Sequence, residues 1–104
     1  MKIIKCELDG KLLMVQFFSV GYDECGLVIR MECVTDDGDA YHAIFQNVSL
    51  LNVANASHPF QIGGFEIIDK LSDGYQKDRR YFIKDYEDGT VSFYCESFEI
   101  FESF

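Results

Sequence analysis

Alternation of apolar and polar side chains with a period of two is the feature that most constrains how this chain folds. Between residues 27 and 34, Leu, Ile, Met and Cys share one face, and Val, Arg and Glu share the other. Residues 4–8, 41–46 and 91–96 alternate in the same way. Because successive side chains of a strand point to opposite faces of a sheet, this spacing predicts β-strands rather than helices.

Short acidic turns separate several of these runs. Asp9-Gly10, Asp36-Asp37-Gly38-Asp39 and Glu87-Asp88-Gly89 all combine Asp with Gly. Glycine adopts positive φ without steric cost, so these segments predict hairpin turns. Gly63-Gly64 interrupts an apolar run over residues 60–68, and we expect a bulge or a bend there.

The remaining segments complete an all-strand prediction. We expect a strand rather than a short helix at 47–53, a loop at 52–59, a polar turn at 71–77, a strand at 79–86 and a final strand with a kink near Glu96-Ser97. The sequence therefore predicts one all-β domain over residues 1–104, an antiparallel meander that closes into a barrel or a two-layer sandwich.

Net charge excludes several classes of partner. The chain of 104 residues carries 18 acidic and 9 basic side chains, which gives a net charge of −9. A nucleic-acid-binding protein needs a basic face, and so does a protein that binds an anionic membrane. No apolar run approaches the roughly 20 residues of a membrane helix. The first residues carry charge too early for a secretory signal, so we expect a cytoplasmic protein.

Catalytic and metal-binding patterns are weak in this sequence. The cysteines, Cys6, Cys25, Cys33 and Cys95, form no CxxC pair, and we expect reduced thiols. We interpret Cys25 as an exposed structural residue rather than a nucleophile.

The histidines and the acidic turns each allow a functional and a structural interpretation. We interpret His42 and His58 as solvent-facing rather than as metal ligands or proton-transfer groups. The acidic turns resemble fragments of calcium loops but lack the twelve-residue frame. We expect no catalytic residue, no metal site and no cofactor.

The C-terminal segment is the part of the sequence that indicates a kind of function. Residues 85–104 contain six acidic side chains and no basic one, and aromatic side chains lie among them. Such a surface favours docking of a basic protein, because opposite potentials speed association and aromatic side chains anchor an interface. The alternative is a solvated face that only keeps the protein soluble. The predicted partner-binding residues are Tyr86, Glu87, Asp88, Tyr94, Glu96, Glu99, Phe101 and Glu102.

Two further hypotheses remain open at this stage. A small-molecule-binding barrel, or a small enzyme, would use an interior pocket lined by Tyr or Phe and converging polar groups. A homodimer would form through an edge strand, for which the C-terminal strand is the candidate, although the glutamates at 96, 99 and 102 discourage it.

Four segments carry a resemblance to a known group of proteins. They are Phe45-Gln46-Asn47-Val48, residues 62–67 (IGGFEI), residues 81–88 (YFIKDYED) and residues 92–96 (SFYCE). Together they are similar to small acidic all-β proteins of bacteria, some of which look like immunity proteins of polymorphic toxin systems. The resemblance implies a cytoplasmic inhibitor that binds a cognate toxin, and many such toxins are basic nucleases. It transfers no binding residues to this chain.

Overall fold

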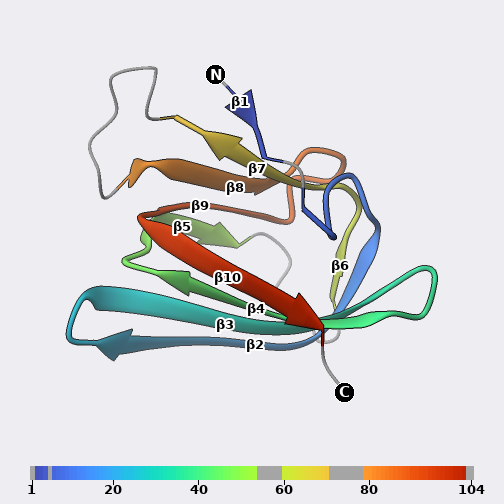
Figure 1. Cartoon of the computed structure of the whole chain (residues 1–104), viewed down its shortest axis with the longest axis horizontal. Coiled ribbons are helices and arrows are strands. Elements are labelled where there is room, and N and C mark those ends of the chain that lie inside the picture. Colours follow the sequence, from blue (N-terminus) through green and yellow to red (C-terminus); the bar gives the residue numbers. More distant parts are fainter. Residues whose placement is uncertain (1, 5, 54–59, 71–78, 103–104) are drawn as a thin grey trace.

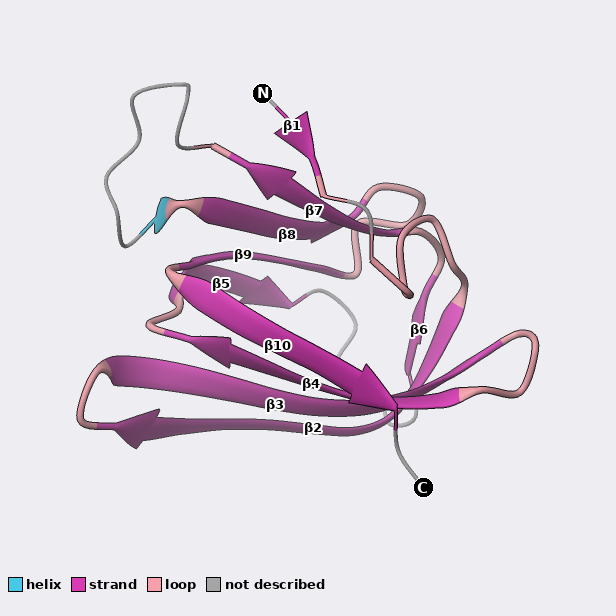
Figure 2. Ribbon diagram, in the orientation of Figure 1, coloured by secondary structure: helices cyan, strands magenta, loops and turns pink. Residues whose placement is uncertain are grey.

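Two antiparallel sheets make up the structure, a computed structural model that describes residues 2–4, 6–53, 60–70 and 79–102 (Figure 1). Strands make up most of the described chain, and turns and loops make up nearly all of the rest, which confirms the all-β antiparallel prediction (Figure 2). Sheet A has the order β1 (Lys2–Ile3), β7 (Phe65–Asp69), β8 (Tyr81–Asp85), β9 (Val91–Cys95), β5 (Ser49–Val53). Sheet B has the order β10 (Ser97–Glu102), β4 (Ala40–Gln46), β3 (Gly26–Thr35), β2 (Leu13–Asp23), β6 (Phe60–Ile62).

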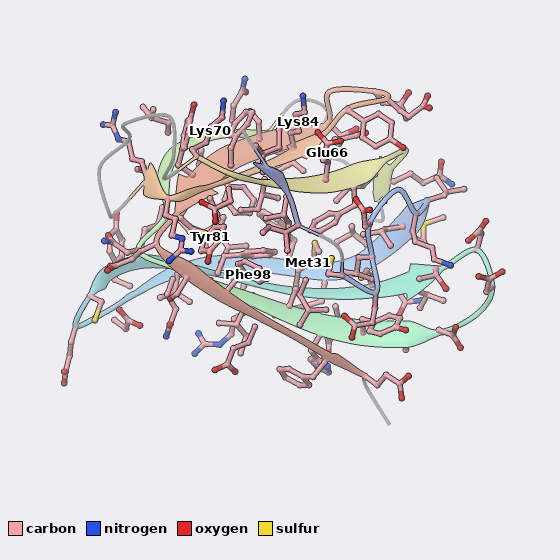
Figure 3. All side chains as sticks on the ribbon, turned by 45° about the horizontal axis from the view of Figure 1, so that its top comes forward. Met31, Glu66, Lys70, Tyr81, Lys84 and Phe98 are labelled. Carbon is pink, nitrogen blue, oxygen red and sulfur yellow. The ribbon has the colours of Figure 1, made fainter. Side chains whose placement is uncertain are left out.

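The hydrophobic core lies between the two sheets, so the molecule is a two-layer arrangement. The Phe45 ring of sheet B meets the Phe93 ring of sheet A edge to face, with centroids 5.0 Å apart. Tyr81 and Phe98 form a similar pair at 4.9 Å, and Figure 3 shows both side chains between the layers. Aromatic pairs in this geometry stabilise a core beyond the burial of their area. The alternating residues of β3, β4 and β9 that the sequence assigned to a buried face do lie in this core.

Three short connections carry the chain from one sheet to the other. Asn47 and Val48 join β4 to β5, and Asn47 has a φ of 53°. Gly63-Gly64 joins β6 of sheet B to β7 of sheet A, which confirms the predicted bend. Glu96 alone separates β9 from β10, at the predicted kink. As a result, strands that follow each other in the sequence at these three points belong to different sheets.

The N-terminal prediction was wrong in its extent. The described residues of the segment 4–8 lie outside any strand: β1 ends at Ile3, and turns occupy residues 7–10. The Asp9-Gly10 turn is present, but β1 pairs with β7 rather than with β2, so no hairpin forms there. Leu8 is nevertheless fully buried, because the turn folds it into the core. An alternating pattern can therefore mark a buried turn as well as a strand.

Some predicted segments lie outside the described residues, namely most of the loop at 52–59, which contains His58, and the turn at 71–77. Within the described ranges, no helix reaches the length and apolarity that crossing a membrane requires.

All four cysteines are free thiols. Burial raises the pKa of Cys33 to about 11 and that of Cys95 to about 12. Cys25, at the β2–β3 turn, is exposed. A thiol with a raised pKa and no access to solvent reacts slowly, so Cys33 and Cys95 are packing residues of the core.

Candidate functional site

The structure distributes the eight predicted partner-binding residues over several regions of the surface. Tyr86, Glu87 and Asp88 lie in the β8–β9 turn and are exposed. Tyr94 lies on the outer face of sheet A, and Glu96 lies in the link between the sheets. The last three residues, Glu99, Phe101 and Glu102, lie on β10 of sheet B and are exposed. Since the outer faces of the two sheets point in opposite directions, Tyr94 and Phe101 do not share a binding surface.

Asp85, directly before the first of these groups, organises the β8–β9 turn. Only 4% of its surface is exposed. One carboxylate oxygen accepts hydrogen bonds from the backbone N–H groups of Gly64 (3.0 Å), Glu87 (3.1 Å) and Asp88 (3.2 Å). The other oxygen accepts one from the Thr90 N–H at 3.2 Å. The acidic turn therefore has the hydrogen bonding of an Asp-capped turn, as expected for this sequence pattern.

The outer face of sheet A is largely occupied by contacts within the sheet. Tyr94 stacks on Phe82 of the neighbouring strand, with ring centroids 4.7 Å apart. Lys84 and Glu66 form an ion pair at 3.8 Å, and Figure 3 shows both on the side of the sheet away from the core. The Tyr94 ring and the Glu66 carboxylate on this face are thus already in contact with side chains of neighbouring strands.

The outer face of sheet B presents a different arrangement, which we call the aromatic–acid row: Phe17, Glu32, His42 and Phe101. The register aligns these four residues across β2, β3, β4 and β10. His42 Nε2 lies 2.6 Å from Glu32 Oε1, and the His42 ring stacks on Phe101 with 5.4 Å between centroids and 2° between planes. Phe17 and Phe101 remain 48% and 46% exposed at the two ends of the row. The row is therefore held by internal contacts and still offers two aromatic surfaces.

A hollow of about 340 Å³ lies within this face. Its lining includes three residues of the row, with Arg30 and Ile44 next to them. Arg30 and Ile44 belong to a second register line, which runs from Ser19 to Glu99. The surface consequently combines a shallow depression, exposed aromatic side chains and carboxylates at Glu32 and Glu99. Aromatic side chains are enriched in protein interfaces; here they flank the charged Glu32, which lies between them in the row.

Sequence reasoning identified Phe101 and Glu99 but missed Phe17 and Glu32. A bulge between Val15 and Phe17 shifts the register of β2 against β3. Without it, alternation from Val15 would turn Phe17 toward the core; with it, Phe17 faces outward and Phe18 inward. The adjacent phenylalanines were the available signal, because two consecutive residues of a strand cannot both face the core.

His42 lies on the outer face, as the sequence predicted. In the described part of the chain its Nδ1 has no hydrogen-bond partner, while Nε2 contacts Glu32. Among the described residues, no three His, Cys, Asp or Glu side chains gather in a way that could hold a metal ion.

A second hollow, of about 320 Å³, lies where the chain crosses between the sheets. Cys25, Arg80 and Glu96 contribute to its lining. Asn47 Nδ2 donates a hydrogen bond to Glu96 Oε1 at 3.2 Å, and Arg80 forms an ion pair with Asp69 at 3.2 Å. The Asn47–Glu96 hydrogen bond ties the β4–β5 and β9–β10 crossings together, and the Arg80–Asp69 pair lies beside β7 and β8 of sheet A.

Comparison with known proteins gave no match: no protein family, no curated protein and no solved structure matches this chain.

Proposed function

We propose that this chain is a non-enzymatic acidic binding domain that covers the basic face of a protein partner. The observation that carries the proposal is the aromatic–acid row on sheet B. Exposed aromatic side chains frequently anchor protein interfaces. Phe17 and Phe101 supply two such anchors on rigid strands, so little conformational entropy is lost when they are covered.

The charge of the chain supports a basic partner. The net charge of −9 attracts a basic partner over a distance of about one Debye length, roughly 10 Å at 0.1 M salt. Glu32 and Glu99 lie on the proposed contact face and would pair with basic side chains. In this arrangement the carboxylates take the positions that nucleic-acid phosphates would occupy on the partner, and inhibition follows from occlusion.

The sharpest form of the proposal is an immunity-type inhibitor that acts in the bacterial cytoplasm on a basic toxin. It is supported by the acidity of the chain and by the four segments that resemble such proteins. The contact surface that we propose differs from the initial sequence hypothesis. It retains Glu99 and Phe101 and adds Phe17 and Glu32. The β8–β9 turn, Tyr94, Glu96 and Glu102 lie outside it; Glu102 pairs with the core residue Tyr41 and so lies on the other face of β10.

The alternative of a small-molecule-binding barrel has less support. It requires space between the sheets, and aromatic pairs such as Phe45–Phe93 and Tyr81–Phe98 occupy that layer. The two hollows described above open on the surface, not between the layers.

Growth protection tests the proposal. The toxin to use is the one encoded beside the gene for this chain, expressed in a bacterium together with the chain. We expect the wild type to restore growth and Phe101→Ala to lose most of the protection. Truncating an anchoring aromatic residue costs about 2 kcal/mol, a weakening of roughly 30-fold.

Leu50→Ala is the matched control, because Leu50 is 62% exposed on sheet A, away from the row. We expect it to protect as the wild type does. Equal protection by Phe101→Ala, Phe17→Ala and their combination would remove the row from the proposal. Absence of a toxin gene beside this one would count against the immunity role.

A further inference from the structure

Among the described residues, most of β2 lies at an edge of sheet B. Over Leu13–Asp23 this strand pairs with β3 on one side. On the other side it pairs with β6 at only three positions, Leu13, Met14 and Val15. Within the described residues, no strand lies beside β2 beyond Val15 on that side. Figure 1 shows β2 at the boundary of the molecule, extending away from β6 toward the β2–β3 turn.

This edge has none of the charged residues that usually protect an exposed strand. Residues 12–22 contain no charged side chain and no proline. Soluble proteins commonly place lysines, other charges or proline on such strands, because unpaired backbone groups are a template for another chain. The opposite edge strand of the same sheet, β10, carries Glu99 and Glu102. Protection is therefore present at one edge of sheet B and missing at the other.

Hydrophobic side chains are exposed along the unprotected edge. Val20 is 47% exposed and Tyr22 is 84% exposed. Both lie on the face of β2 that points toward the core side, because their register partners are Ile29 and Leu27 of β3. Burying these side chains against further apolar surface would stabilise an added strand by removing them from water.

We propose that β2 pairs antiparallel with β2 of a second copy of this chain, about a twofold axis through Val20. The sequence around Val20 is symmetric in character: Phe18 and Tyr22 are aromatic, and Ser19 and Gly21 are small. In an antiparallel pair centred on Val20, each Tyr22 lies opposite Phe18 of the other copy. Cross-strand aromatic pairs of this kind stabilise a sheet. Self-complementarity is what a twofold interface requires, and it favours a second copy over an unrelated strand.

Charge is compatible with this arrangement. The nearest acids, Asp23 and Glu24, lie at the β2–β3 turn. The proposed register places Asp23 opposite Phe17 of the second copy, so that no two carboxylates face each other along the paired strands. The overall charge of −9 on each copy is repulsive at long range, and salt screens that repulsion. Dimerisation should therefore increase with salt, whereas binding to a basic partner should weaken.

Sedimentation equilibrium of the full chain over about a hundredfold range of concentration tests the proposal. We expect the wild type to pass from the monomer mass to twice that mass. Val20→Lys places two ammonium groups opposite each other at the twofold axis, and we expect it to weaken the dimer by about tenfold or more. Circular dichroism verifies that the variant is folded.

Two matched variants locate the interface. Leu50→Lys makes the same change at an exposed position of sheet A, and Phe101→Lys makes it on the other edge strand of sheet B. We expect both to dimerise as the wild type does. A wild type that is monomeric throughout overturns the proposal. Dissociation by Phe101→Lys rather than by Val20→Lys overturns it as well, since the interface would then be β10.

Crosslinking provides a second readout that does not depend on a disruptive substitution. In a Cys25→Ser background, Val20→Cys brings two thiols together at the axis, with Cβ atoms roughly 5 Å apart. We expect a mild oxidant to convert this variant to a covalent dimer much faster than Leu50→Cys in the same background. Equal rates would overturn the proposal. Neither the sedimentation nor the crosslinking experiment requires the basic partner. A negative result would therefore overturn the dimer and leave the proposed function to be tested separately.

Discussion

Replacement of Asp85 tests the account of the β8–β9 turn. Its carboxylate accepts four backbone hydrogen bonds, and the one from Gly64 is buried. Asp85→Ala leaves the Gly64 N–H without a partner, at a cost of about 1–3 kcal/mol. The three other donors are partly buried and recover some hydrogen bonding with water, so each costs about 0.5 kcal/mol. We therefore expect a loss of about 3 kcal/mol in the free energy of unfolding.

Asp85→Asn separates charge from shape. The amide keeps one acceptor oxygen but turns an NH₂ group toward the Thr90 N–H, so we expect a loss of about 1.5 kcal/mol. Urea unfolding followed by circular dichroism measures both variants. Asp88→Asn, an exposed acid in the same turn, should change stability by about 0.5 kcal/mol or less. A loss below about 1 kcal/mol for Asp85→Ala, or an equal loss for Asp88→Asn, would refute this role of Asp85.

The pH dependence of the Asp85 effect has a definite sign. Burial raises the pKa of Asp85, but hydrogen bonds from the backbone of the turn and from Gly64 lower it by more, so that the pKa lies below its ordinary value of 3.8. The carboxylate therefore stabilises the fold fully above that ordinary value, and the contribution is lost as pH falls through the lower, folded-state pKa. The stability difference between wild type and Asp85→Asn should shrink in that range and stay constant at neutral pH. A difference that does not shrink at low pH would contradict the assignment.

The remaining predictions concern packing and thiol access. At Gly64 a Cβ atom would lie 2.6 Å from the Tyr86 ring, so Gly64→Ala should lower the free energy of unfolding by about 1–3 kcal/mol in a urea titration. Gly21→Ala, with no atom within 4 Å of its Cβ, should have little effect, and equal losses would contradict the packing argument. With a thiol reagent at pH 8, Cys25 should react first and the two buried core thiols only after unfolding. Rapid labelling of Cys33 and Cys95 in a folded Cys25→Ser variant would show that the reagent reaches the core, against this prediction.

Local pattern was sufficient to predict most strands. Residues 27–34, 41–46 and 91–95 alternate between an apolar face and a mixed face, and all lie in strands of the structure. Gly63-Gly64 was a sufficient signal for a change of direction, because the close approach of Tyr86 leaves no space for a Cβ atom at Gly64. The prediction failed at residues 4–8, which alternate too. Ile4 N–H still bonds to Ile67 of β7, but the chain then turns, and Asp9 N–H bonds to Cys6 within that turn.

The candidate surface was less predictable, because it depends on which strands become neighbours. Phe101 and His42 are 59 positions apart in the sequence, and only the β4–β10 register brings them together. Phe17 faces outward because of one bulge, which periodicity alone does not specify. Conversely, Tyr94 lies in the same acidic C-terminal segment as Phe101 but faces the opposite side of the molecule. A charge-rich stretch of sequence is therefore divided between two faces when the chain changes sheets at Glu96.

The dissociation constant of the complex with the toxin encoded beside this gene, measured by calorimetry over a range of salt concentrations, tests the central claim most directly. We predict that affinity falls steadily as salt increases, and that Phe17→Ala and Phe101→Ala each weaken binding at every salt concentration while Leu50→Ala does not. Affinity that is independent of salt, or that survives loss of both phenylalanines, would contradict the claim that an acidic, aromatic face of sheet B covers a basic partner.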